Sequence, residues 1–255
     1  KFFNDRDIIM SYFCFYKNWY KTFHIIIFMN KDFFKQVRIL DGGMGQELLA
    51  RGLDSQGTLW SAKALLDEKN HSLVENVHED FVKAGAEVIV TNTFATRKIR
   101  LKQNNLEDKF EILNKYAGKI AKKVKDKYPL ILIAGGLPPQ NKTYSSDMRD
   151  ETEIFNNFKD QAKILNPYVD FFYLDVLSSI REISIAINSI EEFNKPFLIG
   201  AHISEGITLP SGEKLSEITK KIKIKNLLGL ILACVSRENY EKNINEIKSI
   251  GFPFG

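Results

Sequence analysis

The chain has 255 residues, of which 44% are hydrophobic and 27% are charged, a composition that suits a globular protein with one large domain. The formal net charge is only +4 and the lysines are interleaved with acidic residues, so we expect no nucleic-acid partner. Two cysteines cannot form a disulfide framework, and the uncharged runs near the N-terminus are too short to cross a bilayer, which predicts a cytoplasmic protein with no membrane partner.

Residues 1–28 differ in character from the rest of the chain. They are crowded with aromatic and aliphatic side chains that show neither helical nor strand periodicity. Met29 is followed by a short polar stretch and then by an apolar run that starts at Val37. We therefore predict that residues 1–28 are an extraneous or disordered segment, that the natural protein begins at Met29, and that residues 29–255 form the domain.

From Val37 onward, apolar runs alternate with amphipathic segments. Most of the runs are continuously apolar, as expected for parallel strands that are covered on both faces. The first run ends in a carboxylate and three glycines, which predicts a buried strand that delivers Asp41 to a tight turn. The strands we expect are 37–41, 87–92, 130–135, 169–175, 196–202 and 227–233.

Helical periodicity is found between these strands. Two capping boxes, Ser72-x-x-Glu75 and Ser179-x-x-Glu182, predict the first residues of two helices, and Gly85 is suited to end the first of them. Further helices are expected at 107–127, 151–166, 213–224 and 237–250.

Units of one strand followed by one helix fit either a doubly wound sheet or a (β/α)8 barrel. A barrel gathers the carboxyl ends of its strands on one face, and polar or reactive residues occur at those ends here. We therefore predict an α/β fold, a TIM (β/α)8 barrel. Residues 252–255 resemble the start of a seventh strand, so we expect the barrel to be incomplete, with its last one to two strands missing. The strand-end residues are Asp41, Asn92, Asp175, His202 and Cys234.

Several motifs together carry a resemblance to a known family. They are Asp-Gly-Gly-Met-Gly at 41–45, Leu-Trp-Ser-Ala at 59–62, Ala-Gly-Ala at 84–86 with Thr-Asn-Thr-Phe at 91–94, and Ala-Gly-Gly-Leu-Pro-Pro at 134–139. With these motifs the chain resembles, over residues 37–255, the homocysteine S-methyltransferase family. That family includes the betaine-dependent enzymes and the homocysteine-binding module of cobalamin-dependent methionine synthase.

The resemblance implies a zinc-dependent enzyme that methylates the thiol of homocysteine to form methionine. The family holds zinc on three thiolates, of which Cys234 matches the first, while the adjacent pair in a Gly-Gly-Cys-Cys motif has no counterpart before the chain stops. Thiolate ligands hold zinc with an open position, where a substrate thiol is bound and deprotonated. We thus expect zinc as cofactor for the full-length protein, an incomplete ligand set in this chain, and an inactive fragment.

The resemblance also implies substrate contacts. Asp41 and Gly42 match homocysteine-binding positions, the carboxylate suiting the ammonium group of the substrate. Asp175 stands where the family usually has Glu, so its reach is one methylene shorter, and it could instead cap the following helix. The helical His78, beside two acidic residues, is predicted to be a structural or surface residue rather than a ligand.

Two functional hypotheses remain open at this point. The first is a zinc-dependent methyltransferase whose partners are homocysteine and a methyl donor that the sequence does not identify. The second is a non-catalytic homocysteine-binding barrel, a remnant or gene fragment that lacks the zinc cysteine pair. A Schiff-base lyase is disfavoured because none of the predicted strands ends in a lysine. The sequence does not indicate an oligomeric state.

Overall fold

A computed structural model describes residues 33–54, 57–204, 206–223 and 225–255. The predicted N-terminal segment 1–28 and the proposed start at Met29 lie outside these ranges. Within them, the longest and most apolar helices still fall short of what a membrane span requires.

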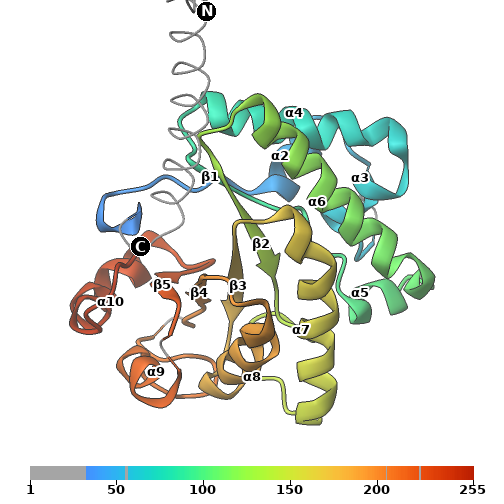
Figure 1. The fold of residues 1–255 in the computed structure, drawn as a ribbon. Coiled ribbons are helices and arrows are strands. Elements are labelled where there is room, and N and C mark those ends of the chain that lie inside the picture. Colours follow the sequence, from blue (N-terminus) through green and yellow to red (C-terminus); the bar gives the residue numbers. More distant parts are fainter. Residues whose placement is uncertain (1–32, 55–56, 205, 224) are drawn as a thin grey trace, which may run out of the picture.

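Five parallel strands form one sheet, and they are hydrogen-bonded to one another in chain order (Figure 1). A doubly wound sheet reverses its strand order at a switch point, and no reversal occurs among these five strands. The α/β class with a parallel sheet is therefore confirmed, and closure into an eight-stranded barrel stays a prediction. The strands are β1 (Val88–Val90), β2 (Leu132–Leu137), β3 (Phe171–Leu177), β4 (Phe197–Ala201) and β5 (Leu227–Leu232).

A short segment before β1 corresponds to the first predicted strand. It forms one parallel bridge, between Leu40 and Val88, rather than a regular strand. The prediction that this strand is buried is wrong, since Val37 is 94% and Ile39 is 56% exposed. The physical reason is that this segment pairs with the sheet on one side only. Its backbone hydrogen bonds within the described residues are made by the amide of Asp41 and the carbonyl of Ile39, and they run toward β1.

The C-terminal residues add to the opposite edge of the sheet. Phe254 forms a parallel bridge with Leu230 of β5, and the amide of Leu232 donates to the carbonyl of Gly255. The strand start predicted at 252–255 thus pairs in the expected direction.

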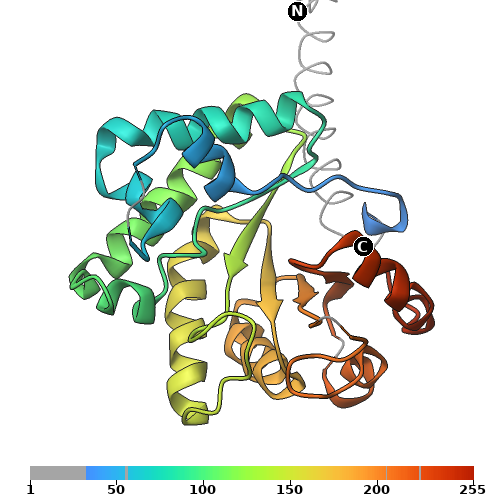
Figure 2. The same ribbon diagram turned by 180° about the vertical axis from the view of Figure 1, so that it is seen from behind.

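The helices lie outside the curved sheet, as the two opposite views show (Figures 1 and 2). Each of the longer ones packs its apolar side toward the strands. The helices are α2 (Met44–Ala50), α3 (Lys63–Leu66), α4 (His71–Lys83), α5 (Lys98–Lys102), α6 (Phe110–Lys127), α7 (Glu151–Leu165), α8 (Ile180–Ile190), α9 (Leu215–Lys221) and α10 (Arg237–Ser249).

Of the two predicted capping boxes, one gives the correct helix start. Ser179 accepts a hydrogen bond from the amide of Glu182 at 3.1 Å and so caps α8. Ser72 instead lies inside α4, which begins at His71, and its hydroxyl donates to the carbonyl of Lys69. A 3-10 turn, Glu68–Asn70, leads directly into α4, so the chain is already helical before the serine is reached.

Both faces of the sheet are buried, as the continuous apolar runs predicted. Successive side chains of a strand point to opposite faces, so each strand contributes to two cores. The outer core, between sheet and helices, includes Ile133, Phe172, Leu174, Ile199, and Phe158 of α7. The inner core includes Leu132, Ala134, Phe171, Tyr173, Leu198 and Leu228.

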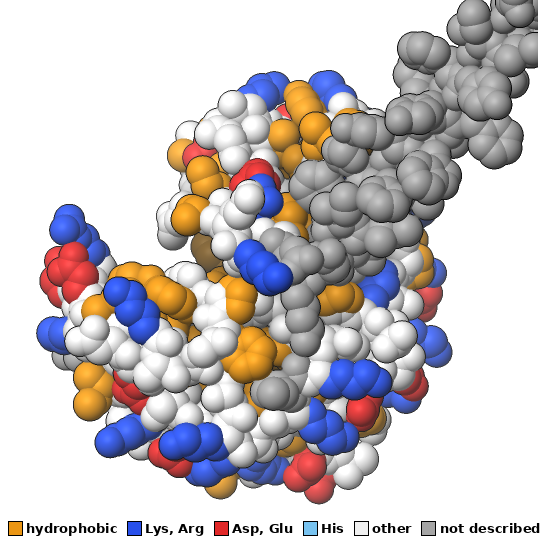
Figure 3. Space-filling view, turned by 60° about the vertical axis from the view of Figure 1, so that its left-hand side comes forward, with side chains coloured by type: hydrophobic (Ala, Val, Ile, Leu, Met, Phe, Trp, Pro, Cys, Tyr) orange, Lys and Arg blue, Asp and Glu red, His pale blue; other side chains and the backbone are white. Residues whose placement is uncertain are grey.

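The surface agrees with the charge pattern of the sequence. On the face shown in Figure 3, lysines and arginines are interspersed with acidic side chains. Salt bridges along single helices, such as Lys115–Glu111 and Lys221–Glu217, account for part of this mixing. Such exposed pairs contribute little stability individually, and they keep the surface polar.

The outer core provides a direct test of the fold. Phe158 is fully buried, and we expect Phe158→Ala to lower the free energy of unfolding by about 3–5 kcal/mol because it leaves a cavity. Leu130, which is 64% exposed, provides the control: Leu130→Ala is expected to change stability by no more than about 0.5 kcal/mol. Urea denaturation measures both, and equal losses in the two variants would contradict the assignment of the core.

Candidate functional site

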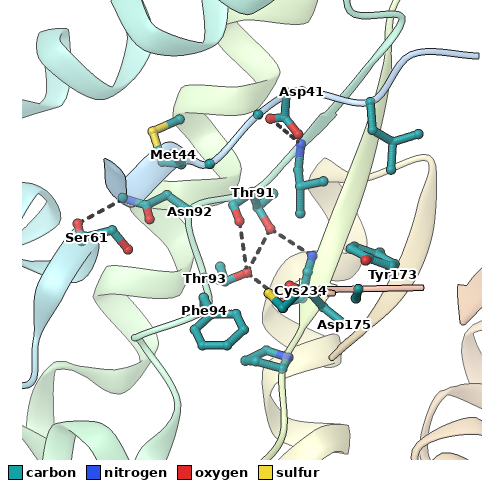
Figure 4. Close-up of a pocket in the computed structure, with 18 of the residues that line it drawn as sticks. Asp41, Met44, Ser61, Thr91, Asn92, Thr93, Phe94, Tyr173, Asp175 and Cys234 are labelled. Atoms are coloured by element: carbon teal, nitrogen blue, oxygen red, sulfur yellow. Dashed lines mark hydrogen bonds between the residues drawn. The ribbon is translucent and has the colours of Figure 1, made fainter. Parts of the chain in front are cut away.

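A cavity of about 480 Å³ lies at the carboxyl ends of the strands. The four predicted site residues, which come from three distant parts of the chain, all line it (Figure 4). Parallel strands in chain order bring their ends to one face, which is where barrel enzymes place their active sites. The structure therefore brings the four predicted residues together at the strand ends, and their role in binding stays a prediction. The four residues are Asp41, Gly42, Asp175 and Cys234.

The glycine-rich turn after Leu40 is shaped by two aromatic rings. A Cβ at position 42 would lie 2.7 Å from the ring of Phe81, and one at position 45 would lie 2.3 Å from the ring of Trp60. Gly42 and Gly45 are therefore required for close packing, and the backbone between them borders the cavity. The indole of Trp60 also meets Phe94 edge to face, with ring centroids 6.2 Å apart, and both rings line the cavity.

The Thr-Asn-Thr motif joins the ends of β1 and β2. Thr93 donates from Oγ1 to the carbonyl of Gly136 at 2.7 Å, and the amide of Gly136 donates to Oγ1 of Thr91 at 3.0 Å. Asn92 donates from Nδ2 to the carbonyl of Ser61 at 3.1 Å, which ties the turn after β1 to the 59–62 motif. These side chains act as a frame for the cavity.

Asp41 is a nearly buried carboxylate, with its side chain 4% exposed. Its Oδ2 accepts a hydrogen bond from the amide of Val90 at 2.9 Å. Burial raises the pKa of Asp41, and His78 and the amide of Val90 act in the opposite direction. The carboxylate is thus held in a defined orientation at the cavity.

Asp175 points into the cavity because it follows Phe171 and Tyr173 on the inner face of β3, and the strand becomes irregular just after it. The pairing of β3 with β4 shifts register between Leu174 and Leu177, and Val176 has a φ of 59°, a strained value for a β-branched residue. The alternative that Asp175 caps the next helix is wrong, since Ser179 caps α8.

The environment of Asp175 favours its neutral form. Burial raises the pKa of Asp175 to about 6, the charge of Asp41 adds to this effect, and a hydrogen bond from Tyr173 opposes it. Two carboxylates that repel one another in one cavity create a site for a cationic group. This electrostatic pairing was not evident from the sequence positions alone.

Cys234 follows β5, is exposed, and has a φ of 55°. The Tyr144 hydroxyl interacts with its sulfur, and the centroid of the Tyr144 ring lies 4.5 Å from that of His202. Partial burial raises the pKa of the Cys234 thiol, while the hydrogen bond from Tyr144 lowers it. His202, predicted at a strand end, supports Tyr144 and does not itself line the cavity.

The donor set for a metal is not complete in the part of the chain that the structure describes. There, no group of three or more His, Cys, Asp or Glu side chains is arranged to hold a metal ion. Cys234 provides one thiol at the cavity, which is one of the three thiolates that the family resemblance implies. The described residues alone therefore do not fit a three-thiolate zinc site.

Two residues at the site were not recognised as such from the sequence. Tyr144 lies in the loop between β2 and α7, where no periodicity indicates which side chain faces the cavity. His78 was predicted to be structural or on the surface, and the surface alternative is wrong because the residue is fully buried. A signal was present, since His78 lies one residue after Val77 and three before Phe81 on the inward face of α4.

A cavity at the carboxyl ends of parallel strands, lined by two carboxylates and a thiol, lies where α/β enzymes with parallel sheets place their active sites. Residues 38–255 match the family model described as "Homocysteine S-methyltransferase". The chain belongs to the homocysteine S-methyltransferase family. The resemblance found in the sequence motifs is thereby confirmed.

The individual relatives have low sequence identity to this chain. Homocysteine S-methyltransferase 1 of Saccharomyces cerevisiae is 25% identical over 233 residues, which cover 79% of this chain and 69% of that protein. S-methylmethionine–homocysteine S-methyltransferase BHMT2 of Rattus norvegicus is 31% identical over 165 residues, which cover 64% of this chain and 42% of that protein. The chain therefore spans less than half the length of the rat relative.

The fold is shared with a solved structure, the metallated form of the homocysteine methyltransferase MmuM from Escherichia coli. The TM-score is 0.76 at 21% identity, over 85% of this chain and 81% of that one. At this identity the likeness establishes the fold alone.

The interaction between Tyr144 and Cys234 leads to a measurable prediction. In a Cys14→Ser background, where Cys234 is the sole remaining cysteine, Tyr144→Phe removes a donor that stabilises the thiolate. We expect the pKa of the Cys234 thiol to rise and alkylation by iodoacetamide at pH 7.5 to slow about three- to tenfold. A full pH profile separates this effect from altered access, and an unchanged midpoint would contradict the assignment.

Asp175 makes a prediction about stability and pH. Its pKa is about 6 in the folded protein against an ordinary 3.8, so the folded state binds more protons between these values, and ionised Asp175 destabilises the fold above pH 6. We expect Asp175→Asn to raise Tm at pH 8 by about 2–4 °C. The gain should shrink as pH falls through 6, and a gain that is independent of pH would refute the electrostatic cause.

Proposed function

We propose that this protein transfers a methyl group to the thiol of homocysteine and so forms methionine. The observation that carries the proposal is the cavity of a family member in which Asp41, Asp175 and Cys234 converge. Homocysteine has an ammonium group at one end and a thiol at the other, and the cavity offers carboxylates for the first and a cysteine at the position expected to hold the second.

The amino end of the substrate is bound by the two carboxylates. An ammonium group placed between Asp41 and Asp175 relieves their mutual repulsion and forms charge-assisted hydrogen bonds with both. Gly42, which lines the same cavity, allows the substrate to approach the backbone closely. These three residues are the proposed homocysteine-binding set.

The transfer itself is an in-line displacement. The substrate thiol loses its proton to solvent, its sulfur forms a bond to the donor's methyl carbon, and the bond from that carbon to the positively charged donor atom breaks. The electron pair stays on the donor, which leaves neutral at that atom. The chain supplies orientation, and the rings of Trp60 and Phe94 form an apolar part of the cavity lining. Relatives named for S-methylmethionine make this sulfonium compound the first donor to test.

We propose zinc as the cofactor, with Cys234 as one of its ligands. When bound, zinc would acidify the substrate thiol. A metallated form of the structurally similar MmuM supports a metal in this family. Because the described residues do not complete the donor set, no step above depends on the ion. A free thiol at the site also suits the reducing cytoplasm, which we propose as the location.

The single thiol at the cavity also favours a second candidate function. A homocysteine-binding barrel without catalytic activity would use the same carboxylates and would not need a complete metal site. The two candidates differ in whether methionine is produced after homocysteine is bound.

The test is methionine formation from L-homocysteine and S-methylmethionine, with added zinc or with a chelator. This chain is expected to be inactive, so the assay uses a form of the protein whose metal-donor set is complete. In that form we expect zinc-dependent activity that Cys234→Ala lowers by about 100-fold or more, as when one group of a preorganised site is removed. Cys14→Ala serves as the matched control and should leave the rate unchanged. Homocysteine binding without methionine formation would favour the second candidate, and the absence of binding would contradict both.

A further inference from the structure

His78 of α4 is a buried titratable side chain beside Asp41, and the proposed function gives it no role. It is fully buried, and neither ring nitrogen has a hydrogen-bond partner within the described residues. Its Nδ1 lies 3.7 Å from Oδ2 of Asp41, just beyond hydrogen-bond length. Unsatisfied buried polar groups are unfavourable and uncommon in native proteins, so this pair calls for a functional explanation.

The face of α4 that carries His78 supports the whole turn at Asp41. His78 and Phe81 are three residues apart and therefore lie on the same side of the helix. The ring of Phe81 packs so closely against Gly42 that a Cβ there would be 2.7 Å away. One helix face thus contacts the backbone of the turn through one side chain and approaches its carboxylate through the other.

The two acidic residues that follow His78 in the helix form salt bridges with other side chains. Glu79 pairs with Lys127 at 2.7 Å, and Asp80 pairs with Arg51 at 2.9 Å. The carboxylate that His78 faces is therefore Asp41, which also accepts from the amide of Val90 through the same Oδ2. Use of Oδ2 on the protein side leaves Oδ1 for a ligand in the cavity.

We propose that His78 is a positioning residue for the recognition of the substrate's ammonium group. When the ammonium engages Oδ1 of Asp41, Nδ1–H of His78 closes onto Oδ2 and, with the amide of Val90, fixes the carboxylate. The inference rests on the proposed function, because it takes homocysteine as the ligand of Asp41. It adds a helix residue, behind the cavity wall, that determines selectivity for amino-acid thiols.

The test compares two thiols that differ only in the ammonium group. L-homocysteine has it, and 4-mercaptobutanoate has the same thiol and carboxylate without it. Calorimetry with zinc present measures both affinities for the wild type, His78→Asn and His78→Gln. Asparagine keeps a donor near the position of Nδ1, whereas the glutamine amide reaches toward that of Nε2, so the two variants are matched in polarity.

We expect His78→Gln to reduce the preference for homocysteine by about tenfold, as for loss of one charge-assisted hydrogen bond. His78→Asn should retain most of the preference, and the affinity for 4-mercaptobutanoate should stay constant. In an Asp41→Asn background, His78→Gln should have no further effect on the preference.

Equal losses for both thiols, or a preference that no substitution at position 78 changes, would overturn the proposal and leave His78 as a packing residue. Thermal denaturation of each variant shows whether it is folded. Should the glutamine variant unfold, the asparagine variant still decides: a lost preference in that folded protein contradicts the proposal. A wild-type protein that does not prefer homocysteine would refute the proposed function itself, and this inference with it.

Discussion

Parallel pairing of the strands in chain order is the constraint on which the rest of the structure depends. Because β1 to β5 run in one direction, every loop that follows a strand lies at the same edge of the sheet. Asp41, Asp175 and Cys234 are far apart in sequence and meet in one cavity for this reason. The arrangement is stable because successive side chains of each strand point to opposite faces of the sheet, where they fill an inner and an outer core.

The site is built from local features that oppose stability. Val176, Cys234 and Tyr144 all have positive φ values, of 59°, 55° and 65°, although none is a glycine. Burial also raises the pKa of both cavity carboxylates, so their charged forms are held at a disadvantage. Strain and buried charge of this kind persist where the surrounding structure enforces them, and they are concentrated at functional sites. In this protein, the well-packed sheet holds the strained residues and the buried carboxylates in place.

Much of this arrangement could be predicted from the sequence, because buried parallel strands leave continuous apolar runs and their ends are marked by polar residues. The runs at β2 to β5 and the strand-end residues Asp41, Asp175 and Cys234 were found in this way, whereas Gly42 and the roles of all four residues were implied by the family resemblance. The predictions that were wrong concern features that depend on tertiary contacts. The segment at 37–41 reads as a buried strand, but it pairs on one side only. Ser72 has the spacing of a cap, but a preceding 3-10 turn had already begun the helix. Tyr144 reaches Cys234 from a loop, and loops carry no periodic signal.

In the proposed function, different residues of the cavity serve recognition and reactivity. The carboxylates proposed to bind the ammonium group are fixed in advance: Asp41 by the amide of Val90, and Asp175 by Tyr173. Preorganisation of this kind reduces the entropy lost on binding. Cys234, proposed to lie at the sulfur of the substrate, is exposed and interacts with the hydroxyl of Tyr144, a residue that is itself 51% exposed. An amino-acid thiol would therefore be oriented by its charged end, and this fixes the direction from which its sulfur can attack a methyl carbon.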